Sequence, residues 1–567
     1  MGFHPVSSKY SKTKTRGTGV PPVFFSFYRF HIPNESLPIA FPPIQTIYYP
    51  MMTHDPSTDS SPIPGTSNDP NGQSANQTPG FKIGGSTPYM IGIGGCGMSA
   101  LARMLAGAGL SITGCDSTPS QVTKALTDFG IKVSFDESAS QLPEESDIVL
   151  ASAAVGPNHP IVLEAINRGL SILSYPEALG KCMTGRTGIA IAGTHGKSTT
   201  TAMLGCALTD AKLDPSVIVG ATCQQIESGA LNKPGNRVGC RVGAAQIPTN
   251  SNFGGWKGKP GILLAEACEF NRSFHNLNPT IASISSIEAD HLDIYGSLDA
   301  VVESFTQFAK LIPDANQGGK LIIGHDGAYR REVTAGLKCA IETIGFNPGA
   351  DWVVGYTDGQ TTITSPDNQT HSWKLALPGQ HNAMNSAVAF ALARSVGADP
   401  DLLEKSFNAF AGLDRRLQLL GSRDGVRVID DYGHHPTEID ATLRALKTAE
   451  NPAKHGGRLI CVFQPHQHSR TRFLLDEFAT SFEHADVVIV PHIYFVRDSE
   501  AERHKVNSSD LVDKLRARGV KAMHLYPFEA IIEQLENMCR PGDLLVVMGA
   551  GPVWQVGQGY LDAGLNR

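Results

Sequence analysis

Seven consecutive residues have the composition of a phosphate-binding turn: Gly193, Thr194, His195, Gly196, Lys197, Ser198 and Thr199. They follow an apolar run at 188–192 and precede a predicted helix at about 198–209. In such a turn backbone N–H groups surround phosphate oxygens, a lysine neutralises the transferred phosphate, and a serine hydroxyl ligates Mg²⁺. Only two residues separate the glycines, whereas a standard P-loop has four. We predict an ATP site here, against the alternative of a plain structural turn.

A second glycine-rich turn lies earlier in the chain. Gly92, Gly94 and Gly97 form a G-x-G-x-x-G pattern between a predicted strand at 89–93 and a helix at about 98–106, and Asp116 ends the next strand. Glycines allow the backbone to approach a diphosphate, and the acid can bind a ribose hydroxyl. The pattern predicts a diphosphate-containing ligand but does not distinguish a dinucleotide from a UDP-sugar. Tight packing alone is the alternative.

Strands and helices alternate along most of the chain, which indicates α/β domains with parallel sheets. A length of 567 residues exceeds what one compact core accommodates. We predict three tandem α/β domains: a Rossmann-like domain at 87–187, a central P-loop-like domain at 188–413 and a Rossmann-like domain at 414–567. Further strands are expected at 147–151, 262–265, 281–284, 426–430, 459–463, 487–490 and 544–548.

Residues 1–86 are rich in Pro, Ser, Thr, Asn and Gly and have little periodic apolar pattern. Such a segment buries too little apolar surface to offset its ordering entropy, so we expect a disordered tail. Met51 and Met52 lie within it as alternative starts.

Charge and cysteine content narrow the class of protein. Lys and Arg number 47 against 54 acidic residues, for a net charge of −7, so nucleic acid is a poor partner. Ten scattered cysteines without a CxxC pair favour a reducing compartment over a disulfide framework. No apolar run approaches the roughly 20 residues that span a bilayer. We expect a cytoplasmic protein without membrane association.

Six short strings in a fixed order resemble the Mur ligases. They are GIGGCGMS, GTHGKST, EADH, HNAMN, DDYGHHPTE and FQPH, and the resemblance covers about residues 88–567. Folylpolyglutamate synthetases share the fold and part of the second string, but not its histidine or the DDYGHHP string. The strings are most similar to those of Mur ligases that add L-alanine to UDP-N-acetylmuramate in peptidoglycan precursor synthesis.

The resemblance implies a reaction and its cofactors. ATP would phosphorylate the lactyl carboxylate of UDP-N-acetylmuramate, and the amine of L-alanine would attack the acyl phosphate. The first domain would bind the UDP-sugar, and the protein would be a monomer or homodimer. The UDP-sugar would contact the first turn through Gly92, Gly94, Gly95, Gly97, Met98, Ser99 and Asp116.

The resemblance also assigns the ATP and metal residues. Lys197, Glu266 and His291 would be catalytic, and Mg²⁺ would be bound by Ser198, Glu266 and His291. Besides the Gly193–Thr199 turn, ATP would contact His381, Asn382, Asn385, Arg415 and Asp430.

The third domain would bind the amino acid through Tyr432, His434, His435, His466 and Arg470, the last by pairing with the carboxylate. Two segments depart from the alanine-adding enzymes: EACEFN at 266–271 replaces the common EADESD, and FQPHQHSR at 463–470 replaces FQPHRYTR. Glu266 is retained, so metal binding is not threatened. The departures leave the choice among alanine, glycine and serine open. The glycine-rich segment from Cys223 to Lys259 has no assigned role.

Three other functions use part of these residues. A recycling ligase that attaches a tripeptide to the same nucleotide sugar is the nearest alternative. An NAD-dependent oxidoreductase would use the first turn and leave the second without a role. A catalytically inactive binding module would not need Lys197, Ser198 and Glu266 together.

Overall fold

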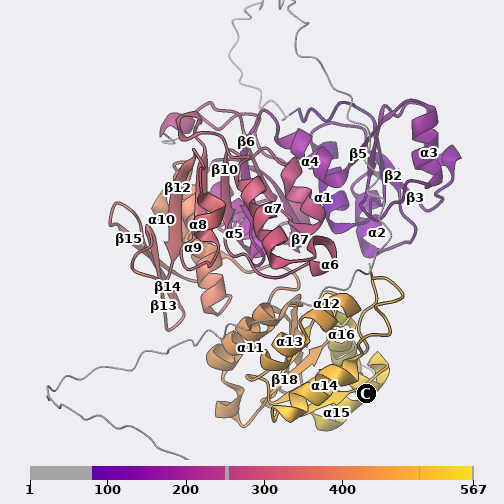
Figure 1. Ribbon diagram of the computed structural model, residues 1–567, viewed down its shortest axis with the longest axis vertical. Coiled ribbons are helices and arrows are strands. Elements are labelled where there is room, and N and C mark those ends of the chain that lie inside the picture. Colours follow the sequence, from indigo (N-terminus) through magenta and orange to yellow (C-terminus); the bar gives the residue numbers. More distant parts are fainter. Residues whose placement is uncertain (1–79, 250–253, 497, 565–567) are drawn as a thin grey trace, which may run out of the picture. The chain divides into compact units, whose positions relative to one another are not determined.

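The computed structural model describes residues 80–249, 254–496 and 498–564. Figure 1 shows helices packed on strands in each of three consecutive parts of this range, which confirms the predicted α/β class. Most of the predicted tail, residues 1–79, lies outside the described residues. Residues 80–86 differ from the prediction, because Phe81 and Ile83 are buried in an apolar cluster. The Asp147 carboxylate also accepts hydrogen bonds from the backbone of Ser86 and Thr87.

The first domain contains a parallel sheet of five strands in the order β3-β2-β1-β4-β5. The strand order reverses beside β1, and ligands bind at such a switch point in open α/β sheets. The first glycine turn follows β1 at this point. The elements are β1 (Pro88–Ile91), α1 (Cys96–Gly107), β2 (Thr113–Cys115), α2 (Gln121–Asp128), β3 (Lys132–Ser134), β4 (Ile148–Ala151), α3 (Pro160–Asn167), β5 (Ser171–Ser174) and α4 (Tyr175–Met183).

The central domain has a ten-stranded mixed sheet in the order β15-β14-β13-β12-β11-β10-β6-β9-β7-β8. Seven neighbouring strands from β13 to β7 are parallel, and β14, β15 and β8 add antiparallel edges. The strands are β6 (Thr187–Ala192), β7 (Ser216–Cys223), β8 (Val238–Arg241), β9 (Ile262–Glu266), β10 (Ile281–Ile284), β11 (Lys320–Gly324), β12 (Ala340–Gly345), β13 (Trp352–Thr357), β14 (Gln360–Thr364) and β15 (Thr370–Lys374). The helices are α5 (Lys197–Asp210), α6 (Leu292–Tyr295), α7 (Leu298–Ala309), α8 (Arg330–Thr334), α9 (Gln380–Ser395) and α10 (Pro400–Ala409).

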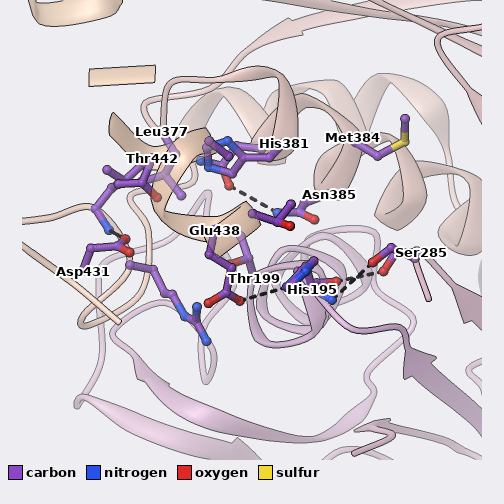
Figure 2. Close-up of a pocket in the computed structure, with 17 residues that line it drawn as sticks. His195, Thr199, Ser285, Leu377, His381, Met384, Asn385, Asp431, Glu438 and Thr442 are labelled. Atoms are coloured by element: carbon purple, nitrogen blue, oxygen red, sulfur yellow. Dashed lines mark hydrogen bonds and ion pairs between the residues drawn. The ribbon is translucent and has the colours of Figure 1, made fainter. Parts of the chain in front are cut away.

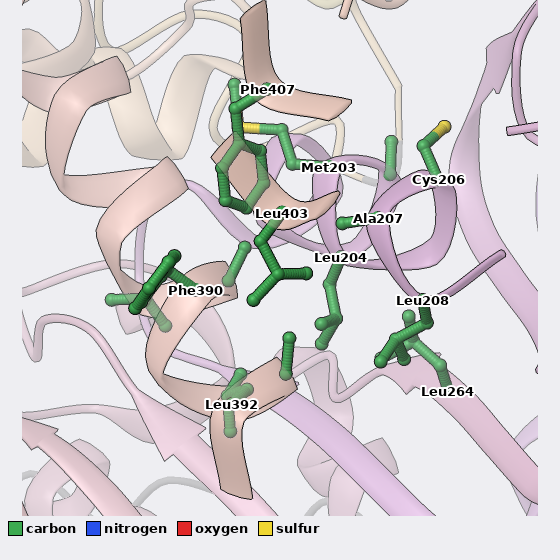
Figure 3. Close-up of a cluster of buried hydrophobic side chains, with 14 of the residues drawn as sticks. Met203, Leu204, Cys206, Ala207, Leu208, Leu264, Phe390, Leu392, Leu403 and Phe407 are labelled. Carbon is green, nitrogen blue, oxygen red and sulfur yellow. The ribbon is translucent and has the colours of Figure 1, made fainter. Parts of the chain in front are cut away.

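Both faces of the central sheet are buried at β6, because successive side chains of a strand point to opposite faces and all six residues of β6 are buried. Ile189 and Ile191 point into one apolar cluster with α5, α9 and α10, whereas Ala190 and Ala192 point into a second cluster on the opposite face. Helix α5 is enclosed by the first cluster, which Figure 3 shows around Leu204, Phe390, Leu403 and Phe407. This packing fixes the helix whose N-terminus carries the second glycine turn.

The part of the Cys223 to Lys259 segment around β8 packs against the first domain. Its strand β8 pairs antiparallel with β7, and both strands contact helix α1. Two glycines make the contact close: a Cβ on Gly107 would lie 3.0 Å from Val242, and one on Gly239 would lie 3.6 Å from Ala100. Strand β8, which lies in the segment without an assigned role, is therefore part of a packing surface.

The third domain has a six-stranded sheet in the order β16-β17-β21-β18-β19-β20, in which only β16 is antiparallel to its neighbour. The elements are β16 (Gln418–Arg423), β17 (Val426–Asp431), α11 (Pro436–Glu450), β18 (Leu459–Phe463), α12 (His468–Phe473), α13 (Leu475–Thr480), β19 (Val487–Val490), α14 (Ser508–Ala517), β20 (Ala522–His524), α15 (Phe528–Met538), β21 (Leu544–Met548) and α16 (Trp554–Asp562). No helix in the described ranges is both long and apolar enough to cross a membrane.

Truncating a core side chain beside α5 tests this packing. Leu403 is fully buried, so Leu403→Ala should lower the free energy of unfolding of the central domain by about 2–5 kcal/mol through lost contacts and a residual cavity. Leu231 is 44% exposed, and Leu231→Ala should change it by less than about 0.5 kcal/mol. Urea denaturation of both variants measures the difference, and equal effects would contradict the assigned core.

Candidate active site

The second glycine turn joins β6 to α5 in a conformation that needs glycine. Gly193 and Gly196 have φ values of 131° and 80°, which side-chain-bearing residues rarely adopt. A Cβ at Gly193 would lie 2.1 Å from the Ser285 hydroxyl, and one at Gly196 would lie 2.2 Å from Oδ1 of Asn385. The turn therefore lies between the predicted strand and the predicted helix, and neighbouring side chains closely surround its backbone.

The N-terminus of α5 fits a phosphate group. The helix has 14 residues, and no described side chain caps its first turn. Uncapped N–H groups at a helix N-terminus bind anions. Residues 197–199 begin this helix, so the predicted phosphate contacts of Lys197, Ser198 and Thr199 lie on one turn.

The Lys197 side chain is engaged with the protein. Its Nζ atom donates hydrogen bonds to the carbonyl oxygens of Gly193 and Thr194 at 2.7 and 3.0 Å and lies 2.9 Å from the Glu269 carboxylate. Burial alone would lower the pKa of Lys197, but the charge of Glu269 is the largest of several effects that raise it to about 12. The lysine is thus a fully charged group at the turn. Glu269 was not predicted, although it stands in the same acidic string as Glu266.

The predicted metal ligands divide between two places. Oε2 of Glu266 accepts a hydrogen bond of 2.7 Å from the Gly220 N–H, while its buried Oε1 has no hydrogen-bond partner among the described residues. His291 instead groups with Glu269 and Asp290, whose ligand atoms all lie within 4.8 Å of one another. These donors are mostly oxygens, which suits Mg²⁺, and the unpaired Oε1 is a further candidate ligand. The residues present therefore fit the expected metal ion.

A cavity of about 190 Å³ lies beside the turn. Figure 2 shows His381 and Asn385 on one side of it and Asp431 and Glu438 among the other lining residues. Leu377, Met384 and Leu417 contribute apolar surface, which suits a planar base. The structure thus brings the predicted residues His381, Asn382 and Asn385 together with His195, Gly196 and Thr199.

Two predicted ATP residues do not line this cavity, and their sequence neighbours do. Arg416 and Asp431 face the cavity, whereas Arg415 and Asp430 pair with each other at 3.1 Å. Asp430 and Asp431 are consecutive residues of β17, so their side chains point to opposite faces. Burial is the main effect that raises the pKa of Asp430 to about 6. The structure therefore favours the second residue of each pair as the contact to nucleotide.

The residues predicted to bind the amino-acid substrate do not all lie in one place. The rings of Tyr432, His434 and His466 lie together. The ring centroid of His434 is 5.4 Å from that of Tyr432 and 6.1 Å from that of His466. His435 instead caps α11, accepting a hydrogen bond from the Thr437 N–H at Nδ1. Arg470 donates from Nε and Nη2 to Oδ1 of Asp290 at 3.0 and 2.9 Å and is only 7% exposed, so its guanidinium already has a carboxylate partner.

The first glycine turn is held by the acid that was predicted to bind the UDP-sugar. Oδ2 of Asp116 accepts a hydrogen bond of 2.8 Å from the Gly94 N–H. Met98 and Ser99 are buried in α1, so we expect at most their backbone to face a ligand. No described side chain caps α1 at Gly95, which leaves its first N–H groups free for a diphosphate.

Comparison with known proteins gives three consecutive family matches: the Mur ligase family catalytic domain at 87–187, the Mur ligase middle domain at 191–393 and the Mur ligase glutamate ligase domain at 415–551. A UDP-N-acetylmuramate–L-alanine ligase of Clostridium novyi is 36% identical over 481 residues, which cover 84% of this chain and 97% of the relative. One of Agathobacter rectalis is 36% identical over 491 residues, covering 85% and 99%. The chain belongs to the Mur ligase family.

Solved structures show the same fold for this Mur ligase. A UDP-N-acetylmuramate-alanine ligase from Thermotoga maritima superimposes with a TM-score of 0.66 at 21% identity, covering 85% of this chain and 99% of that one. A murein peptide ligase from Psychrobacter arcticus gives 0.63 at 24% identity, with the same coverage. Both likenesses concern the fold alone.

Matched substitutions distinguish the two aspartates of β17. Asp431→Asn should weaken ATP binding about tenfold or more, because a charged hydrogen-bonding group facing the cavity is lost. Asp430→Asn should change the affinity by less than about twofold, since Asp430 pairs with Arg415 outside the cavity. Titration calorimetry with ATP and Mg²⁺ measures both, and the opposite order would contradict the placement.

Proposed function

We propose that this Mur ligase joins L-alanine to the lactyl carboxylate of UDP-N-acetylmuramate at the expense of ATP. The observation that carries the proposal is the Gly193–Thr199 turn, with Lys197 and an uncapped helix N-terminus beside a cavity of nucleobase character. The names of the curated relatives support the two substrates. We also propose that the reaction takes place in the cytoplasm.

The cationic groups of the site would bind the phosphates, and its carboxylate, hydroxyl and imidazole groups would bind Mg²⁺. ATP supplies the phosphoryl group that activates the carboxylate, and Mg²⁺ neutralises its phosphates. Lys197 would hold the β- and γ-phosphates together with the N–H groups of α5. Ser198, Glu266 and His291 remain the proposed metal ligands, and Glu269 and Asp290 join them as candidates because of their position near His291.

Two departures from the alanine-adding enzymes, Gln467 and His468, fall near the expected site of the amine substrate. Gln467 and His468 are 3% and 7% exposed, so these substituted side chains face the protein interior. The Asp498 carboxylate accepts hydrogen bonds from the backbone of His468 and Ser469. Burial of the substituted side chains supports retention of L-alanine, with the tripeptide as the alternative amine.

Phosphate release tests the substrates. We expect release from ATP only when UDP-N-acetylmuramate, L-alanine and Mg²⁺ are all present, and its loss on addition of EDTA. Parallel reactions with glycine, serine and the tripeptide identify the preferred amine. A protein that releases no phosphate with any of the four amines would overturn the proposal.

A lysine substitution tests the turn. Lys197→Ala should lower kcat by about 100-fold or more, because a charge at the transferred phosphate is removed. Lys320→Ala is the matched control, since Lys320 forms a similar lysine–glutamate pair with Glu342 at 2.6 Å on β11 and β12. Steady-state kinetics and circular dichroism compare the variants. Full activity of Lys197→Ala would mean that the turn does not bind the transferred phosphate.

A further inference from the structure

The side chain of His195 leaves the phosphate-binding turn and contacts two carboxylates from distant parts of the chain. Its Nδ1 atom lies 3.2 Å from Oε1 of Glu438 on α11, and its Nε2 atom lies 3.2 Å from Oε2 of Glu288, which follows β10. Oε2 of Glu288 also accepts a hydrogen bond of 2.6 Å from the Thr437 hydroxyl. Figure 2 shows His195 and Glu438 facing each other beside the cavity. This network joins the turn to the first turn of α11 in the third domain.

The contacts indicate a protonated ring, because Nδ1 lies within hydrogen-bond distance of Glu438 and Nε2 lies within ion-pair distance of Glu288. Burial alone would lower the pKa of His195, but the neighbouring carboxylates of Glu288 and Glu438 raise it to about 9. An ion pair held between two carboxylates is therefore the form of this histidine at neutral pH.

A metal site is the competing interpretation, because His195, Glu288 and His435 place their ligand atoms within 4.8 Å of one another. The hydrogen bonds argue against it. Nδ1 of His435 accepts from the Thr437 N–H at 3.3 Å, and its Nε2 lies 3.3 Å from the Ala289 carbonyl oxygen, so both ring nitrogens are in use. A protonated His195 has no lone pair to offer a cation.

The backbone of His195 is also held on the side of the central domain. Its N–H donates to the Ser286 hydroxyl at 3.3 Å, and its carbonyl oxygen accepts from the Ser285 hydroxyl at 2.8 Å. The backbone is thus fixed by the central domain and the side chain by the third domain. A change at Glu438 would therefore reach the peptide groups that line the phosphate site.

We propose that Glu438 is a positioning residue for the nucleotide reaction, acting through His195 on the backbone of the phosphate-binding turn. Its second oxygen accepts a hydrogen bond from the His434 N–H at 3.1 Å, so the carboxylate is itself held in place. The inference rests on the proposed ATP site. It adds a residue for which the sequence motifs indicated no role.

Replacing the carboxylate by an amide of the same shape tests the proposal. Glu438→Gln should lower kcat/KM for ATP by about 10- to 100-fold, because a charged hydrogen bond that positions the turn is lost. KM for UDP-N-acetylmuramate should stay within about twofold, since the first glycine turn does not contact this network. Calorimetry with AMP-PNP and Mg²⁺ should show a matching loss of nucleotide affinity without turnover.

A double-mutant cycle separates a linked pair from two independent effects. If Glu438 acts through His195, then His195→Asn combined with Glu438→Gln should lose no more activity than the more severe single variant. Glu404→Gln is the matched control, because it removes the carboxylate from another histidine–glutamate pair, His371 and Glu404, 2.8 Å apart in the central domain. That control should leave the ATP parameters unchanged.

Unchanged ATP parameters in Glu438→Gln would overturn the proposal, as would losses that multiply in the double variant or that affect both substrates equally. If Glu438→Gln does not fold, His195→Asn decides by the same measurements, and full nucleotide affinity in that variant also overturns it. A wild-type protein that neither turns over nor binds AMP-PNP would mean that the proposed function itself has failed.

Discussion

A turn that surrounds a phosphate with backbone N–H groups needs glycine where the backbone adopts positive φ and no space is left for a Cβ, and the turn after β6 satisfies this constraint. Gly193 and Gly196 adopt positive φ values, and Ser285 and Asn385 occupy the space that a Cβ would need. The turn is therefore specified twice, by backbone conformation and by close packing. The extensive burial of α5 serves the same end, because it keeps the uncapped helix N-terminus in one position.

Charge pairing is the second feature of the site. Lys197 pairs with Glu269, Arg470 with Asp290, and His195 with Glu288 and Glu438, and each of these pairs joins segments distant in sequence. A partly buried charge without a partner is costly, so these contacts keep the site charged in the absence of phosphate. A bound polyanion would compete with the carboxylates for the same cations. The positions of the cations are thus prepared before the nucleotide binds.

The glycine turns and their neighbouring strands and helices could be predicted because they depend on local sequence. An apolar run, a glycine pair and a helix-forming stretch suffice for such a unit, and the strands β6, β9 and β10 confirm the expected positions. The packed residues 80–86 were missed, because two apolar side chains in a proline- and glycine-rich segment have no periodicity to reveal them. The role of β8 was missed for a similar reason, since its contacts with α1 lie in another domain.

By itself the sequence determined the class of fold, the two turns and the residue types that surround them, because these follow from spacing along one chain. Only the tertiary structure decided which member of each neighbouring pair faces the cavity. The sequence alone does not distinguish Arg415 from Arg416, or Asp430 from Asp431, because each pair has the same side chain at adjacent positions. The pleat of β17 places the two aspartates on opposite faces. The tertiary structure also decided that Arg470 pairs with Asp290 and that Glu438 contacts His195, because charged residues far apart in sequence come together only when the domains pack.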